Sequence, residues 1–238
     1  MKLSEKKNFV LAFNGDSITH GGRGTTMDCN HIMGHGYQEM AAAEVGRRFL
    51  KETPRFYNKG VSGQGLFDMA SRWEEEIIAV RPDAVTILIG INDSGKYGKD
   101  YPADRWEETY RSVLNRTREV LPETQILLMD PFYFEVLGQN ASYRDVPHPE
   151  VEPAFGLPCA NMTAAAAAER HAVVREMQKT VAVLTKEFDT LHIETEAVLE
   201  KAVREVPVQY ITWDGVHPTM IGHRLLADAW LEAAEKIF

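Results

Sequence analysis

The sequence predicts an α/β fold in which a mostly parallel β-sheet carries helices on both faces. Short apolar runs alternate with longer amphipathic stretches along the 238 residues, which is the order expected of right-handed βαβ crossovers. The run AVTILIG at 84–90 is almost entirely apolar and rich in β-branched residues. Such a run is typical of a strand that is buried on both faces.

Five short apolar runs are the predicted strands. The stretch NFVLAF opens the series, and RFYN follows the first amphipathic stretch. In a sheet built this way, ligands bind beyond the carboxyl ends of the strands, where the strand order reverses. The predicted strands cover 8–13, 55–58, 84–90, 125–130 and 190–194.

The predicted helices carry apolar residues at steps of three and four. Arg81-Pro82 ends the second of them, because proline cannot continue a helix. The alanine run at 164–168 favours a helix by propensity alone, with Asn161 or Thr163 as its cap. The predicted helices cover 36–50, 66–80, 103–120, 163–188 and 219–238.

Length and composition predict a single domain that spans 1–238. The net charge of −9 argues against nucleic acid and membrane surfaces as partners, because phosphates are bound by basic faces. No apolar segment reaches the roughly 20 residues that span a bilayer, and none of signal-peptide length follows the basic start. Cys29 and Cys159 lie far apart without CxxC spacing. We therefore predict a reduced, cytoplasmic protein.

The region 131–162 has a different composition from the rest of the chain. It is rich in proline and aromatic residues and has no clear period. Loops of this length in compact domains are usually lids, binding loops or interfaces. We predict one of these roles, and we hypothesise that copies of the chain associate into a homo-oligomer through this region.

Four polar, glycine-containing stretches follow predicted strands or precede the last helix. Because the carboxyl ends of parallel strands meet at one edge of a sheet, we expect these stretches to converge. They are Gly15-Asp16-Ser17, NKGVSG at 58–63, GINDSG at 90–95 and WDGVHP at 213–218.

Together these stretches contain the parts of an acyl-transfer site. Asp214 and His217 lie three positions apart, which lets a carboxylate orient an imidazole that takes a proton from a hydroxyl. Ser17 needs such a base, because an isolated serine hydroxyl is a poor nucleophile at neutral pH. The backbone N–H groups of Ser17 and Gly63 and the side-chain amide of Asn92 are candidates for the oxyanion hole.

Each stretch also has an ordinary structural explanation. Gly, Asp and Ser are common in turns, and an Asp before a helix is a common cap. All four explanations would have to hold at once, so we favour a catalytic site. Trp213 is a candidate wall of the substrate pocket, with core packing as the alternative. His20 and His35 lie near Ser17 without partners at metal-binding spacing, so we predict no metal and no cofactor.

In this order, the four stretches resemble the conserved blocks of the SGNH (GDSL-type) hydrolases. Ser17, Gly63, Asn92 and His217 correspond to the four residues that name that family, and Asp214 corresponds to the acid that partners the histidine. The resemblance implies a three-layer α/β/α, flavodoxin-like fold around five parallel strands. It also implies ester cleavage by a serine mechanism, with a covalent acyl-enzyme and no metal.

Further stretches resemble one branch of that family, which contains intracellular acetylxylan esterases and related carbohydrate deacetylases. They are GYQEM, RFYNKGVSG, VTILIGIND and LLMDPF, although Gln64-Gly65 stands where the branch often has Asn-Arg. The branch implies an esterase that removes acetyl groups from a small-molecule or oligosaccharide ester. A lysophospholipase or thioesterase for longer acyl chains is the alternative among enzymes. A carbohydrate-binding protein without catalysis is the alternative outside them.

Overall fold

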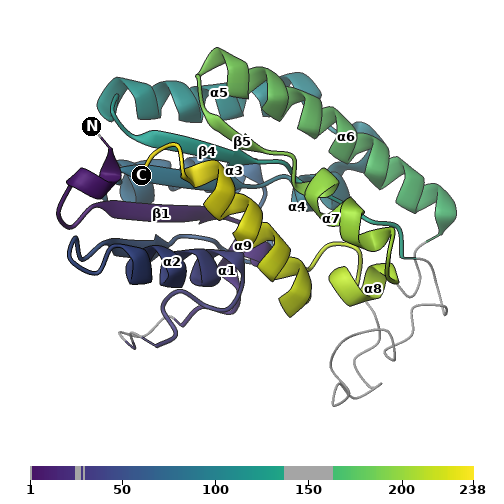
Figure 1. Cartoon of the computed structure of the whole chain (residues 1–238). Helices are drawn as coiled ribbons and strands as arrows, with labels where there is room; N and C mark the ends of the chain where they lie inside the picture. The colour runs from purple at the N-terminus through teal and green to yellow at the C-terminus, as the bar shows by residue number, and fades with distance from the viewer. Residues whose placement is uncertain (1, 25–27, 29, 137–162) are drawn as a thin grey trace.

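A five-stranded sheet, parallel throughout, forms the centre of the protein (Figure 1). The strands are β1 (Val10–Gly15), β2 (Arg55–Asn58), β3 (Ala84–Leu88), β4 (Gln125–Met129) and β5 (Leu191–Ile193). The computed structural model describes residues 2–24, 28, 30–136 and 163–238. In space the strands follow the order β2-β1-β3-β4-β5. The strand order therefore reverses beside β1.

Apolar residues determine which strands lie in the middle of the sheet. Every residue of β3 is buried, and β3 pairs with β1 and β4. The edge strands β2 and β5 keep partly exposed residues. β1 and β3 are in register, with Gly15 opposite Leu88 at their carboxyl ends. The segments that follow these two strands therefore start side by side at one edge.

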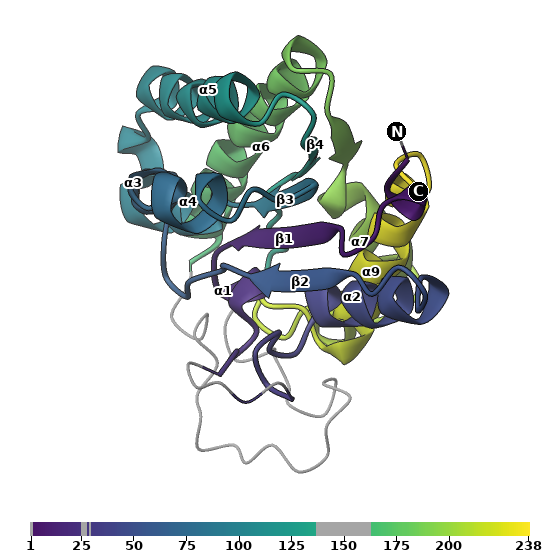
Figure 2. The ribbon, with the colours of Figure 1, turned by 90° about the vertical axis from the view of Figure 1, so that its left-hand side faces the viewer.

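Helices cover both faces of the sheet and complete three layers (Figure 1, Figure 2). The helices are α1 (Ser17–His20), α2 (Tyr37–Arg48), α3 (Leu66–Ser71), α4 (Ile91–Tyr97), α5 (Ala103–Val120), α6 (Ala164–Glu187), α7 (Thr195–Val203), α8 (Val208–Ile211) and α9 (Met220–Ala234). α2, α7 and α9 pack with the sheet around one core, and α3, α5 and α6 pack around a second core on the other face. None of the helices in the described ranges has the length and apolar character needed to span a membrane.

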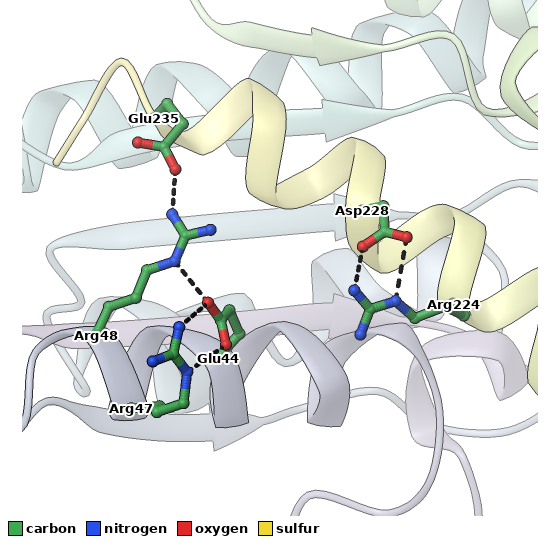
Figure 3. Close-up of polar contacts among 6 residues, drawn as sticks. All are labelled: Glu44, Arg47, Arg48, Arg224, Asp228 and Glu235. Atoms are coloured by element: carbon green, nitrogen blue, oxygen red, sulfur yellow. Dashed lines mark hydrogen bonds and ion pairs between the residues drawn. The ribbon is translucent and has the colours of Figure 1, made fainter.

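α2 and α9 are neighbours on one face of the sheet, and Figure 3 shows the ion pairs on their surface. Arg48 of α2 pairs with Glu235, just beyond α9, and with Glu44 of its own helix. The Arg224–Asp228 pair lies within α9. Exposed pairs of this kind contribute little to stability, because solvent screens the charges. The buried apolar residues of the two helices therefore supply most of their attachment.

The fold class and the positions of the five strands are confirmed. The prediction of one continuous helix over 66–80 is wrong. α3 ends at Ser71, and a π-helical turn follows at Glu74–Ile78. Arg72 lies at this break, and its side chain reaches the loop after β2. The predictions that concern Cys29, Cys159, Asn161 and residues 137–162 lie outside the described residues.

Candidate active site

Ser17 is the first residue of α1, the single helical turn that follows β1. Asp16 caps this turn, because its Oδ1 accepts the N–H of Ile18 at 2.9 Å. Gly15 allows the backbone of β1 to approach the neighbouring strand β3 closely, since a Cβ there would lie 2.2 Å from the carbonyl oxygen of Leu88. The cap and the strand packing hold Ser17 at the carboxyl edge of the sheet.

His217 and Asp214 lie in the loop between α8 and α9. Oδ1 of Asp214 accepts the N–H groups of Val216 at 2.9 Å and His217 at 2.7 Å, which shapes the loop as an Asx turn. Oδ2 of Asp214 lies 2.6 Å from His217 Nδ1. At the other side of the ring, Nε2 lies 2.8 Å from Ser17 Oγ. The structure thus joins these three predicted site residues in one hydrogen-bonded chain.

The charges around these three hydrogen-bonded residues favour proton transfer from Ser17 to His217. Burial alone would lower the pKa of His217, but the hydrogen bond to Asp214 and the charge of its carboxylate outweigh burial and raise that pKa. Burial would raise the pKa of Asp214, but its contacts with His217 bring it below the ordinary value. Burial also raises the pKa of neighbouring Asp16 to about 7. At neutral pH the site therefore holds an ionised Asp214 beside an unusually basic imidazole.

The three predicted oxyanion donors are held in different ways. Within the part of the chain that the structure describes, the Ser17 N–H makes no hydrogen bond. Gly63 has φ +81°, and nothing lies within 4 Å of the place a Cβ would take, so a ligand can approach its backbone. The Asn92 amide donates one hydrogen to the Gln64 carbonyl at 2.9 Å, which leaves its second hydrogen for another acceptor.

Arg72, which no sequence motif indicated, holds the loop that carries Gly63. Its guanidinium donates to the carbonyl of Lys59 at 2.8 Å, to Oε1 of Gln64 at 2.6 Å and to Oδ1 of Asn14 at 3.0 Å. Burial lowers the pKa of Arg72 to about 10, so the side chain stays charged at neutral pH. The loop after β2 is therefore tied to the end of β1, where Ser17 follows.

A segment after β4 also reaches the site. The Phe134 N–H donates to the carbonyl of Gly215 at 2.9 Å. Gly215 has φ +86°, and a Cβ there would lie 2.0 Å from the Phe134 carbonyl oxygen. Only glycine fits this contact, which joins the described part of the 131–162 region to the loop of Asp214 and His217.

A cavity of about 470 Å³ opens beside the serine, and Trp213 is part of its wall. The Trp213 ring stacks on the His217 imidazole with 6.2 Å between centroids. Within the described ranges, no three His, Cys, Asp or Glu side chains are grouped so that they could hold a metal ion. The lining includes Ser17, His20, His35, Ser62, Trp213, His217 and His223. The sequence pattern predicted His223 to lie in an amphipathic helix, and nothing in it indicated that this side chain lines the cavity.

Proteins with similar sequences and structures include acetylxylan esterases. The chain is 29% identical over 230 residues to an acetylxylan esterase of Geobacillus stearothermophilus. The alignment covers 93% of this chain and 91% of that protein. A solved structure of an acetylxylan esterase from the same organism matches with a TM-score of 0.75 at 27% identity, over 98% of this chain and 96% of that chain. A protein assigned as a GDSL-like lipase, from Parabacteroides merdae, matches with a TM-score of 0.76 at 30% identity over 97% of both chains.

The model of one family spans nearly the whole chain. It matches residues 13–225, and all four polar stretches of the candidate site lie within this range. The solved structure of a catalytic mutant of the Geobacillus esterase matches over 98% of this chain with a TM-score of 0.74, so the two chains share the same α/β fold. The chain belongs to the GDSL-like lipase/acylhydrolase family and is a serine hydrolase of carboxylic ester bonds.

Proposed function

We propose that the protein removes acetyl and other short acyl groups from oxygen on carbohydrates, by means of a triad of Ser17, His217 and Asp214. The observation that carries this proposal is the hydrogen-bonded chain from Ser17 Oγ through the imidazole to the Asp214 carboxylate. Solved structures of the Geobacillus acetylxylan esterase include catalytic mutants of a serine, an aspartate and a histidine, the last two three positions apart. Asp214 and His217 have the same spacing.

In the proposed acylation step, Ser17 Oγ attacks the carbonyl carbon of the ester while its proton passes to His217 Nε2. The carbonyl oxygen becomes an oxyanion, stabilised by the N–H groups of Ser17 and Gly63 and by the Asn92 amide. Asp214 stabilises the imidazolium that forms. The carbon–oxygen bond to the alcohol then breaks, and the leaving alcohol takes the proton from His217.

Deacylation repeats the same chemistry with water as the nucleophile. His217 takes a proton from the water as its oxygen attacks the acyl carbon. The second tetrahedral intermediate collapses, the bond to Ser17 Oγ breaks, and His217 returns the proton to that oxygen. The products are an alcohol and a carboxylic acid, and the enzyme returns to its starting state.

We expect kcat/KM to fall at acid pH with a midpoint above the ordinary histidine pKa of about 6.5. His217 must be neutral to accept the Ser17 proton, and the Asp214 carboxylate raises its pKa. As the pH falls through this raised value, the base is converted to its protonated, inactive form. Activity then falls about tenfold for each further pH unit. Initial rates with 4-nitrophenyl acetate over a range of about pH 5–9 measure this limb.

Asp16 titrates in the same range, and Asp16→Asn separates the two groups. The asparagine keeps an oxygen that can accept the Ile18 N–H, as Asp16 Oδ1 does. The acid limb should persist in this variant with a slightly lower midpoint, because the Asp16 charge also raises the pKa of His217. If activity no longer falls at acid pH in Asp16→Asn, the titrating group is Asp16, which would contradict the role given to His217.

We expect acetyl esters to be the best substrates in a chain-length series of 4-nitrophenyl esters. Ile18 contributes the aliphatic side chain in the described lining of the cavity, and the other lining residues are mostly histidine, serine and glycine. Such a surface suits a polar substrate better than a long acyl chain. Acetate release from acetylated xylan oligosaccharides, absent in Ser17→Ala, tests the carbohydrate part.

Two results of these assays would contradict the proposal. Activity that is highest on esters with acyl chains of roughly eight carbons or more would favour a lysophospholipase or thioesterase. No cleavage of any ester, together with no labelling of Ser17 by a fluorophosphonate probe, would favour a carbohydrate-binding protein without catalysis.

A further inference from the structure

The cavity beside Ser17 is much larger than an acetyl group requires. Its volume of about 470 Å³ lies in the range of sites that enclose whole small molecules. If the acyl group is short, as the proposed function states, the rest of this space is available to the alcohol part of the ester. The side chains that line the cavity therefore select the alcohol.

His223 of α9 is the buried histidine of this lining, with 8% of its surface exposed. Its Nδ1 accepts the backbone N–H of Tyr37 at 3.2 Å. The same side of the ring lies against Gly36, where a Cβ would be 3.0 Å from Cε1 and 3.1 Å from Nδ1. A ring nitrogen that accepts a hydrogen bond carries no proton, so the proton of the neutral ring is on Nε2.

Burial keeps this imidazole uncharged. Loss of solvation is the largest cause that lowers the pKa of His223 to about 3, and the nearby His35 and His217 lower it further. Among the described residues, Nε2 has no hydrogen-bond partner, and His223 is one of the side chains that line the cavity. The ring is thus a neutral N–H donor on α9, in the wall of the cavity that contains Ser17.

We propose that His223 determines specificity by donating its Nε2 hydrogen to a hydroxyl or ring oxygen of a neutral sugar in the alcohol part of the ester. A neutral donor suits an uncharged oxygen, and it supplies neither the positive charge that favours phosphate or carboxylate nor an acceptor for ammonium. Trp213 offers a flat apolar ring in the same cavity, against which a sugar ring can pack. This inference rests on the proposed esterase function and names the group that recognises the alcohol.

Two substitutions separate the roles of the two ring nitrogens. His223→Asn keeps an oxygen near the position of Nδ1 for the Tyr37 N–H and removes the donor at Nε2. His223→Gln places an amide N–H near the position of Nε2 and removes the acceptor at Nδ1. Both variants are assayed with a mono-acetylated methyl xyloside and with 4-nitrophenyl acetate, whose alcohol part has no hydroxyl group. His192→Asn is the matched control, because His192 binds Asp130 at 2.7 Å and does not line this cavity.

For His223→Asn we expect kcat/KM on the xyloside to fall about tenfold, mostly through KM, and on 4-nitrophenyl acetate only about twofold. His223→Gln should keep more of the xyloside activity than His223→Asn. If His223 only accepts the Tyr37 N–H, His223→Asn should keep more activity than His223→Gln. Each variant should then lose equal activity on the two esters. That result would overturn the proposal. Thermal unfolding of each variant shows whether a loss of activity reflects a loss of folded protein.

The wild-type protein distinguishes a failure of this inference from a failure of the proposed function. If neither ester is cleaved, the proposed function is wrong. If both are cleaved and His223→Asn loses equally on both, only the role of His223 is wrong. If 4-nitrophenyl acetate alone is cleaved, the carbohydrate assignment and the role of His223 are both wrong.

Discussion

Ser17→Ala is expected to lower the turnover of 4-nitrophenyl acetate by roughly 10⁴- to 10⁶-fold, because no other atom can form the acyl-enzyme. The fold should be retained. The Ser17 side chain makes its hydrogen bond to His217, while the cap of α1 comes from Asp16. The rate is measured as acetate released in samples that are quenched at set times. Mass spectrometry after a brief incubation with substrate shows whether an acyl group is attached to the protein.

Ser71→Ala is the matched control for this variant. Ser71 lies at the end of α3, is exposed, and donates its Oγ–H to the carbonyl of Asp68. It should retain wild-type turnover. Activity of Ser17→Ala within tenfold of wild type, or an acyl group on another residue, would end the proposed mechanism.

Asp214→Asn should lower kcat by roughly 10⁴-fold with little change in stability. Its amide oxygen can still accept the N–H groups of Val216 and His217, so the turn is kept. The amide NH₂, however, faces His217 Nδ1 as a donor, and the ring must then carry its proton on Nε2. In that tautomer the imidazole cannot accept the Ser17 proton.

The pH profile adds a second measurement for the same variant. Without the carboxylate that raises the pKa of His217, the acid limb of the residual activity should move to lower pH. Asp228→Asn, which removes an exposed carboxylate from α9, should change neither rate nor limb. A limb that stays at the wild-type position in Asp214→Asn would show that Asp214 does not set the basicity of His217.

The sheet and its polar edge could be predicted because their signals are local. Buried parallel strands need unbroken apolar runs, and β3 is such a run with every residue buried. Residues that follow parallel strands must meet at one edge. Ser17 and Asn92 follow β1 and β3, so they could be expected at that edge. His217 precedes the last helix, and the motif that it forms with Asp214 indicated a partner for Ser17, 200 positions away. Their side chains lie 2.8 Å apart in the structure.

Other features depend on contacts that no local pattern records. α4 begins inside the GINDSG stretch, where the polar residue Asp93 is buried and accepts the Leu66 N–H at 2.9 Å. Arg72 interrupts an amphipathic pattern, and its partners come from two separate segments, the end of β1 and the loop after β2. His223 has the spacing of a core position in α9. Its role depends on Tyr37, which lies 186 positions earlier.

The separation between Ser17 and His217, the proposed nucleophile and base, makes catalysis a reporter of complete folding. Ser17 follows β1, whereas His217 stands just before α9, so their contact forms only when α9 is docked on α2 and the sheet. Partly unfolded molecules that have lost this docking can keep most of their strands and helices and still turn over no substrate. During denaturation, activity should therefore disappear at or before the loss of secondary structure. During refolding, it should return with the slow formation of long-range contacts rather than with the fast formation of helices.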